Sequence, residues 1–260
     1  MDQTLITQCQ RWRNGRSSYR PAGEVFDTSR ASIELVDEAT AKAFVEQHHY
    51  SRSMPAARLR VGVFVKPAFG EAFLGGVMVF SVPMTQRVIP STLKVPAEQG
   101  VELGRMVLLD SLASNAETFS LGKAFKLLRR TLPEVRGVVA YCDPLERRDA
   151  DGTLTKRGHT GTIYRAHNAV ALGRGSARTL WLLPDGRVAS ERAMSKLRAG
   201  DTGHEYAERM LRDAGAPRRE TAEAGAEWIL RLKKDGFLRR LAHPGNFRFA
   251  WRLDGQKLAA

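Results

Sequence analysis

Hydrophobic and polar residues follow periods along the chain that predict its strands, helices and turns. Segments in which apolar residues alternate, or run unbroken between turn residues, are typical of β-strands. We expect strands at 31–37, 58–65, 72–82, 101–110, 137–143 and 243–253. The sequence KPAFGE between the second and third of these segments predicts a hairpin turn.

Apolar residues that recur every three to four positions predict helices in other segments. We expect helices at 38–49 and 120–134, a helix that begins within 158–173 and breaks at Gly173, and helical structure over 191–240. In the first helix, Asp37 stands at the N-cap position. Its apolar face consists of Ala41, Phe44, Val45 and His48.

The remaining segments predict loops and connections. We expect loops at 83–100, which holds three prolines, at 111–119 and at 144–158, and a hairpin over Pro-Asp-Gly at 178–190. The order strand, helix, strand over 101–143 predicts a right-handed parallel crossover. The predicted fold class is therefore α/β (α+β), a mixed and mostly antiparallel sheet with one central parallel strand pair and helices on both faces.

Three regions follow from the order of these elements. Residues 1–30 are polar and rich in arginine, which predicts a flexible or docking arm, 31–190 form the core, and 191–260 form a helical extension that closes with a strand. No segment approaches 18 consecutive apolar residues, and the N-terminus lacks the apolar region of a signal peptide. We expect a cytoplasmic protein that has no membrane partner.

Charge adds the first indication of a partner. The 260 residues include 41 Lys and Arg and carry a formal net charge of +13, spread along the chain. A basic folded surface favours a polyanion such as DNA or RNA, and the alternative is solvated charge without a partner. The two cysteines, Cys9 and Cys142, lie outside any C-x-x-C motif, which indicates free thiols in a reducing compartment.

Chemically capable side chains gather at the end of the first predicted helix, in HHYSRS (48–53). Histidine and tyrosine serve as general acids or bases, metal ligands or base-stacking groups, and the alternative is that they only end and pack the helix. Asp143 follows a predicted parallel strand at its carboxyl end, where ligand groups concentrate in α/β sheets, or else forms a turn. Glu102 and Arg105 are polar residues inside a predicted strand, either a buried ion pair or substrate-positioning groups.

The predicted order of elements is similar to the GNAT acyltransferase fold. In that fold the central parallel strands splay apart around acyl-CoA, and its pyrophosphate meets N–H groups at the start of the helix that follows the fourth strand. The sequence FSLGKA fits the family's spacing there, with Phe119 in place of the usual Gln or Arg. The resemblance implies that acyl-CoA (acetyl-CoA) is bound by Ser120, Leu121, Gly122, Lys123 and Ala124.

A narrower resemblance rests on five motifs in order. The motifs HYSRSMP (49–55), ELGRMVLLD (102–110), YCDP (141–144), GHTGTIYRAHN (158–168) and HPGNFRFAWRL (243–253) resemble the phage Mom family. Proteins of that family add a carbamoylmethyl group to the N6 amine of adenine in DNA. The resemblance covers residues 30–255, and the insert 145–157 departs from the family's spacing.

The two resemblances imply roles for the candidate residues, with the acid role of Tyr164 taken from the GNAT fold, and charge alone suggests the basic residues as phosphate contacts or as solvated surface. The implied catalytic residues are His49, Tyr50, Ser51, Asp143 and Tyr164, with Tyr164 as a catalytic acid. An iron ion would be held by His49, Tyr50 and Asp143. Substrate and DNA contacts would come from Arg52, Arg58, Glu102, Arg105, Lys156, Arg157 and His159.

The leading hypothesis is therefore a Mom-type, GNAT-like enzyme that converts adenine to N6-carbamoylmethyladenine in double-stranded DNA and protects phage DNA from restriction. It would be encoded by a phage or prophage, work in the host cytoplasm, and be a monomer or homodimer. Two alternatives are a GNAT N-acyltransferase that acts on a protein, tRNA or small amine, and a non-catalytic basic DNA-binding protein with a GNAT-like core.

Overall fold

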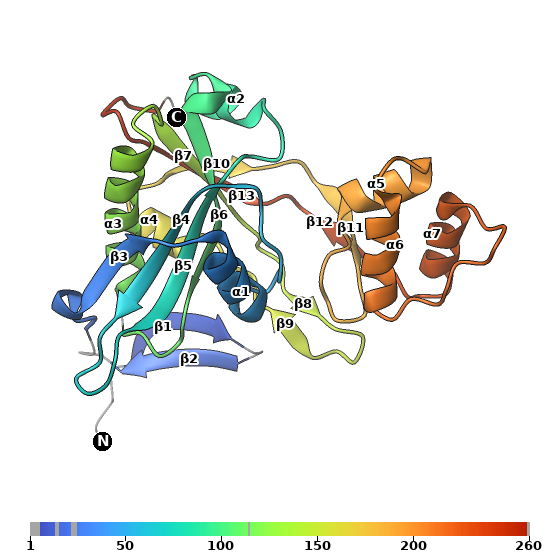
Figure 1. Cartoon of the computed structure of the whole chain (residues 1–260), viewed down its shortest axis with the longest axis horizontal. Coiled ribbons are helices and arrows are strands. Elements are labelled where there is room, and N and C mark those ends of the chain that lie inside the picture. The colour runs from blue at the N-terminus through green and yellow to red at the C-terminus, as the bar shows by residue number, and fades with distance from the viewer. Residues whose placement is uncertain (1–5, 14–15, 22–24, 114, 259–260) are drawn as a thin grey trace. The chain divides into compact units, whose positions relative to one another are not determined.

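The computed structural model describes residues 6–13, 16–21, 25–113 and 115–258, and the chain forms two compact units (Figure 1). Unit 1 comprises Met1–Pro144, His159–Gly175 and Asn246–Ala260, and unit 2 comprises Leu145–Gly158 and Ser176–Gly245. The predicted regions 31–190 and 191–260 differ from these units. The chain leaves unit 1 twice and returns to it for the final strand, which the order of predicted elements did not indicate.

Unit 1 is built on a seven-stranded mixed sheet. Its neighbouring strands run antiparallel except for the parallel pair β6 and β7, which confirms the predicted fold class. In spatial order the strands are β10 (Val170–Arg174), β13 (Phe247–Arg252), β7 (Gly137–Cys142), β6 (Gly100–Leu108), β5 (Phe73–Ser81), β4 (Ala57–Val65) and β3 (Ala31–Leu35).

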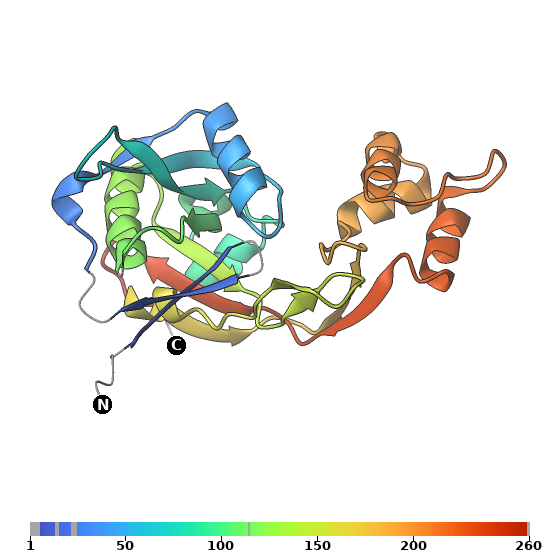
Figure 2. The same cartoon turned by 90° about the horizontal axis from the view of Figure 1, so that it is seen from below.

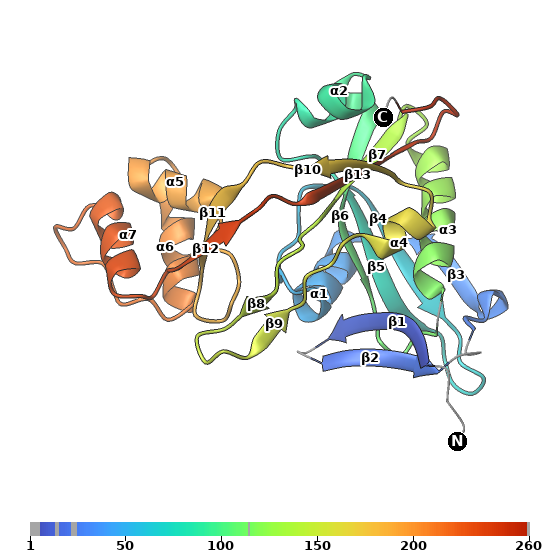
Figure 3. The ribbon, with the colours of Figure 1, turned by 180° about the vertical axis from the view of Figure 1, so that it is seen from behind.

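Helices cover both faces of this sheet (Figure 2). The alternation along β5 separates the faces, because Val77 and Val79 pack with α1 (Glu38–His48), whereas Met78 and Phe80 pack with α3 (Ala116–Thr131). The short helix α2 (Val88–Leu93) lies on the α1 face, against Val139 and Ala250. The helix α4 (Thr162–Ala166) lies on the α3 face, as the view from behind shows (Figure 3).

Local chemistry explains where these helices begin. The Asp37 carboxylate accepts a hydrogen bond from the Thr40 amide at 2.8 Å, which confirms the predicted N-cap of α1. Helix α3 begins at Ala116, four residues before its predicted start, because Asn115 turns the chain with a φ of 67°. Helix α2 lies in a predicted loop, and its Pro90 is tolerated because the first turn of a helix leaves its N–H groups unpaired.

Two further predictions were wrong within 144–174. The predicted charged loop contains a small hairpin, β8 (Arg147–Arg148) and β9 (Leu154–Lys156). The predicted helix in 158–173 is only the five-residue α4, after which β10 runs through Gly173 and joins the edge of the sheet. The pairing of β10 with the distant β13 overrides the local helical pattern.

Unit 2 combines a two-stranded ribbon with three helices. Strand β11 (Arg178–Leu182) pairs with β12 (Arg239–His243), so the predicted hairpin at 178–190 is reduced to a bridge between Leu182 and Val188. The helical prediction for 191–240 is confirmed by three separate helices, in which the buried indole of Trp228 donates to the Pro217 carbonyl at 3.1 Å. They are α5 (Glu191–Ala199), α6 (His204–Asp213) and α7 (Gly225–Lys234).

Shorter elements complete the description. Strands β1 (Ile6–Arg13) and β2 (Arg16–Pro21) form an antiparallel hairpin, and short 3-10 turns lie at Thr28–Arg30 and Ala97–Gln99. Parts of the predicted flexible arm, residues 1–5, 14–15 and 22–24, lie outside the described residues, as does the side chain of Cys9. Cys142 is buried and is not part of a disulfide. Among the described residues, no helix is long and apolar enough to cross a membrane.

Candidate active site

The central parallel strands separate within unit 1, and polar side chains gather at that point. The pairing of β6 with β7 runs only from Gly100–Gly137 to the pair Glu102–Val139. Beyond it, β6 continues to pair with β5 and β7 with β13. We call the place where the two strands part the fork. Glu102 is the last residue of β6 that pairs with β7 and therefore lies at the fork.

A β-bulge follows Glu102 directly. The neighbours Val79 and Phe80 on β5 pair with Arg105 and Leu103 on β6, so Gly104 is the extra residue. A glycine suits this position because a Cβ at Gly104 would lie 2.3 Å from Ser81 Oγ and 3.3 Å from Pro55 Cγ. The bulge resets the alternation of β6, so that Glu102, opposite Ser81, and Arg105, opposite Val79, lie on the same face of the sheet.

The segment after α1 is tied to this bulge. Arg105 donates from Nε to the Ser53 carbonyl at 2.8 Å, from one terminal nitrogen to Ser53 Oγ at 3.0 Å, and from the other to the Gly104 carbonyl at 2.6 Å. A guanidinium has a fixed fork of donors, so these bonds fix the loop relative to β6. The predicted Glu102–Arg105 ion pair is not a direct contact, since the guanidinium bonds these backbone and hydroxyl oxygens instead.

His49 and Ser51 extend the same network. Ser51 Oγ lies 2.8 Å from His49 Nδ1, its amide donates to Nδ1 at 3.1 Å, and the Ser53 hydroxyl donates to Ser51 Oγ at 3.3 Å. A ring nitrogen that accepts from an amide carries no proton, so neutral His49 is protonated on Nε2. The segment therefore presents His49 as a hydrogen-bond donor through Nε2.

Tyr50 and Arg52 occupy the exposed side of the loop. The Tyr50 ring lies 4.2 Å from the His49 ring, tilted by 32°, and the side chain is 36% exposed. The Arg52 amide donates to the His49 carbonyl at 2.9 Å, and Arg52 adopts a φ of 45°, a strained conformation for a residue with a side chain. This tight turn presents an aromatic ring and a cation to solvent. That the segment faces a substrate stays a prediction.

Electrostatic effects connect the loop to the fork. Burial raises the pKa of Glu102 to about 7, and the nearby Arg105 guanidinium opposes the rise. Burial lowers the pKa of Arg105, while Tyr50 and Glu102 raise it. Each of these groups influences the pKa of another, so Tyr50, Glu102 and Arg105 form one electrostatic site. Glu102 is suited to proton transfer near neutral pH because its pKa is close to the working pH.

Tyr164 contributes to this site from α4. Its ring is buried in T-shaped contacts with Phe249 and Trp251, at centroid distances of 5.5 Å and 5.4 Å. Burial raises the pKa of Tyr164 well above its ordinary value, and the charges of Cys142, Tyr50 and Glu102 raise it further. The hydroxyl therefore remains protonated at neutral pH and is a hydrogen-bond donor.

Tyr141 is a site residue that the sequence did not single out. It lies on β7, two residues beyond the last pair with β6, and on the same face as Val139. Burial raises the pKa of Tyr141, and the Glu102 carboxylate raises it further. Tyr141 is part of the YCDP motif, two residues before Asp143, and the glycine inside the predicted strand 101–110 is the sequence signal of the bulge.

Asp143, His159 and Arg58 are predicted site residues whose hydrogen bonds, within the described part of the chain, do not involve Glu102 or Arg105. Asp143 follows β7 and is buried, and its carbonyl accepts the exposed His159's amide at 3.0 Å. The Arg58 guanidinium contacts the Glu98 and Gly100 carbonyls and the Glu134 carboxylate, so we leave Arg58 out of the DNA-binding set.

The basic pair in the insert belongs to unit 2. Lys156 is 2% exposed, and its Nζ donates to the carbonyls of Leu145 at 2.7 Å and Arg157 at 2.9 Å. A buried ammonium with these partners supports the β8–β9 hairpin and has no access to a phosphate. Arg157 is only partly exposed, so neither side chain has the open surface expected of a phosphate contact.

The predicted cofactor residues, Ser120 to Ala124, lie inside α3. The helix begins at Ala116, so amides in its second turn face the helix's own carbonyls and are not the unpaired amides of a helix start. Leu121 and Ala124 are buried in the core, and Lys123 is exposed. Acyl-CoA binding by this segment stays a prediction, and these positions do not offer the expected pyrophosphate cradle.

The predicted iron site would require metal-binding side chains that lie close together. Across the part of the chain that the structure describes, no group of three or more His, Cys, Asp or Glu side chains is arranged to hold a metal ion. The set of His49, Tyr50 and Asp143 includes a phenol and only two such side chains. Iron binding by this set stays a prediction.

Comparison with the models of known protein families gives a match to the Mom protein family. The model of the Mom protein family matches residues 30–225, which include α1, the HHYSRS segment, the fork and α4. No curated protein matches the chain.

Proposed function

This chain belongs to the Mom protein family, which places it among phage DNA-modification proteins, and we propose that it modifies the N6 amine of adenine with Glu102 as the proton acceptor. The observation that carries the proposal is the half-buried Glu102 at the fork, with a pKa of about 7, beside Tyr50 and Arg105. The expected product is N6-carbamoylmethyladenine in double-stranded DNA.

The chemistry of adenine explains the need for such a group. The N6 amine is conjugated with the ring and is a poor nucleophile, so a bond from N6 to the carbon of a donor requires loss of an N–H proton. The ionised Glu102 carboxylate accepts that proton as the N–C bond forms. A carboxylate whose pKa is raised to about 7 is a stronger base than an ordinary one and is still partly ionised at neutral pH.

The loop after α1 supplies the contacts to the base. An adenine inside a duplex is inaccessible and has to leave the stack before it reacts. The exposed Tyr50 ring offers a stacking surface, and Arg52 next to it offers a cation for the adjacent phosphate. Arg105 holds this loop by its bonds to Ser53 and is a positioning residue.

As the N6–C bond forms, the bond between that carbon and the donor's leaving group breaks, and the leaving group keeps the electron pair. Tyr164 donates a hydrogen bond to the leaving group, in line with its predicted role as an acid. The high pKa of its hydroxyl keeps it protonated, so it serves as a donor and not as a base. These steps use only side chains of this chain, and the identity of the group donor does not alter them.

The product explains a protective effect. The N6 amine is a hydrogen-bond donor in the major groove, where proteins read adenine through it. A carbamoylmethyl group adds bulk there and removes one of the two N–H donors. Restriction enzymes that read this amine would lose a contact and meet a steric clash, so modified phage DNA resists cleavage.

A GNAT-type N-acyltransferase is the second candidate, because the parting of two central parallel strands is the feature that acyl-CoA requires in that fold. The placement of Ser120 to Ala124 inside α3 counts against it. Mass spectrometry of nucleosides from plasmid DNA of cells that express the protein decides between them. A deoxyadenosine heavier by one carbamoylmethyl group supports the proposal. Unmodified DNA together with saturable acyl-CoA binding supports the acyltransferase.

A further inference from the structure

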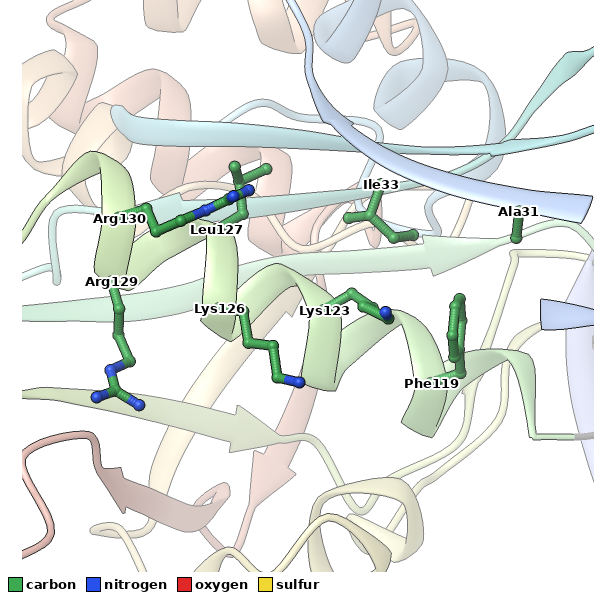
Figure 4. A pocket seen from close by; sticks show the side chains of 8 residues that line it. All are labelled: Ala31, Ile33, Phe119, Lys123, Lys126, Leu127, Arg129 and Arg130. Carbon is green, nitrogen blue, oxygen red and sulfur yellow. The ribbon is translucent and has the colours of Figure 1, made fainter. Parts of the chain in front are cut away.

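A basic pocket lies away from the fork, between α3 and the edge strand β3 (Figure 4). Its volume is about 710 Å³. Four of its eight lining residues are cations on α3, and no acidic residue lines it. The cations are Lys123, Lys126, Arg129 and Arg130, and the remaining lining residues are Ala31, Ile33, Phe119 and Leu127.

We propose that this pocket binds the phosphodiester backbone of DNA that flanks the modified adenine. The inference rests on DNA being the substrate. The pocket lies on the α3 face of the sheet, whereas Glu102 lies on the α1 face, so the contact is with flanking phosphates and not with the reacting base.

The four cations are available for such a contact. Each of them is exposed, and within the described residues Lys126, Arg129 and Arg130 have no acidic partner. Lys123 makes a cation–π contact with the Phe119 ring at 5.5 Å, which holds its stem along the pocket without neutralising its charge. Arg58, by contrast, is compensated by the Glu134 carboxylate.

The spacing of these cations fits an extended polyanion. Lys123 and Arg130 are seven residues apart, so the row covers about 10 Å along the helix axis. One DNA strand advances about 3.4 Å per nucleotide, so the row matches about three successive phosphates. Strands β4 and β5 lie between β3 and β6, so the distance from β3 to β6 across the sheet is about 14 Å. Roughly four base pairs of DNA cover this distance along the duplex axis.

A phosphate backbone fits better than a small phosphorylated ligand. A pocket for a small anion is expected to hold it with buried, fixed donors. Here all four cations are exposed and lie on long side chains. The apolar surface of Phe119, Ile33 and Leu127 gives the deoxyribose a place to pack.

The test measures DNA affinity of the full chain by fluorescence anisotropy with a labelled 24-base-pair duplex, at several KCl concentrations. The pocket variant combines Lys123→Gln, Lys126→Gln, Arg129→Gln and Arg130→Gln. The matched control removes four exposed cations of unit 2, by Arg192→Gln, Arg209→Gln, Arg212→Gln and Lys234→Gln. Both variants lose the same charge, and circular dichroism confirms that each is folded.

We expect the pocket variant to bind at least tenfold more weakly at low salt, and the slope of log Kd against log salt to fall by about 2–4, since each phosphate contact contributes about 0.9. The control should change affinity by less than threefold. The single variant Lys126→Glu should weaken DNA binding severalfold. It shows whether the loss in the pocket variant could come only from combining four changes.

Unchanged affinity of the pocket variant would overturn the inference, and so would an equal loss in both variants, which would mean that affinity follows net charge alone. A pocket variant that keeps its DNA affinity but no longer modifies adenine would point to a small phosphorylated ligand and would also overturn it. Nucleoside mass spectrometry reports the proposed reaction separately, so the two proposals fail by different measurements.

Discussion

Glu102 and Arg105 lie three positions apart on β6 and still share one face of the sheet. In a regular strand an odd separation places two side chains on opposite faces. The extra residue Gly104 resets the alternation, so both side chains lie on the face that α1 covers. The carboxylate at the fork and the guanidinium that holds the loop therefore come from one bulge.

Glu102→Gln should abolish adenine modification and leave DNA affinity within twofold, because the amide cannot accept the N6 proton. In the wild type, the ionised fraction of Glu102 grows as pH rises through its pKa of about 7. The modification rate in an extract that supplies the donor should rise from pH 5.5 to 8.5 with an apparent pKa near 7. Glu102→Asp should retain some activity. A pH-independent rate, or an active Glu102→Gln, would remove Glu102 from the proton-transfer step.

Stability should depend on pH through the same carboxyl group. Its folded pKa of about 7 exceeds its unfolded value, so the native state holds the proton more tightly between about pH 4.5 and 7. The free energy of unfolding therefore falls as pH rises through this window, by on the order of 2–3 kcal/mol, and levels off above it. Urea unfolding of the wild type and Glu102→Gln at pH 5 and pH 8 checks this. The Gln variant should be the more stable protein at pH 8 and should lack this part of the pH dependence.

Gly104→Ala should destabilise the protein by about 1–3 kcal/mol, because its Cβ would lie 2.3 Å from Ser81 Oγ. Ser81→Ala removes that oxygen and should restore part of the stability in the double variant. A double-mutant cycle measured by urea unfolding gives the coupling between the two sites. Strictly additive effects would show that the contact with Ser81 does not limit residue 104.

Arg105→Lys should lower modification at least tenfold, since lysine keeps the charge but cannot bond Ser53 and Gly104 together. Ser53→Ala is the matched control, because it removes one hydroxyl contact and retains the bond from Arg105 Nε to the Ser53 carbonyl. We expect a loss of less than fivefold in the control. Protease cleavage within 49–55 should be faster in Arg105→Lys. Equal activity in wild type and Arg105→Lys would show that the loop is held without the guanidinium.

Tyr164→Phe should reduce modification by two orders of magnitude or more while the thermal midpoint stays within about 2–4 °C, a shift expected from about 1 kcal/mol. The ring contacts with Phe249 and Trp251 remain in this variant, and only the hydroxyl is lost. Tyr206→Phe, at an exposed position on α6, is the control and should have no effect. Full activity of Tyr164→Phe would reduce Tyr164 to a core residue.

Sequence patterns predicted the elements whose signals are local. The α1 helix followed from its apolar spacing and the cap Asp37, and most strands of the central sheet were found within one or two residues. Gly173 was predicted to end a helix, but it lies in a strand with a φ of 71°. Pro90 was predicted to lie in a loop, but it lies in the first turn of a helix. The pairing of β10 with the distant β13 decides the first case, and the position of the proline within its own helix decides the second.

The site was predictable in its parts but not in its connections. The HHYSRS segment and Glu102 are visible as polar residues in otherwise regular elements. The bonds between Arg105 and Ser53 join residues 52 positions apart, and no periodicity encodes that pairing. The partner of β11 is likewise β12, about 60 residues later, which is why unit 2 could not be recognised as an insertion.

The two departures of the chain into unit 2 have closely spaced ends. The Asp143 carbonyl accepts the His159 amide at 3.0 Å, and the Gly175 amide donates to the Asn246 carbonyl at 2.9 Å. At each junction the two ends lie within hydrogen-bonding distance, so a tight turn could join them directly. Deleting or exchanging unit 2 would therefore require only two new turns in the chain. Every strand of the sheet that carries the fork would keep its order and its partners.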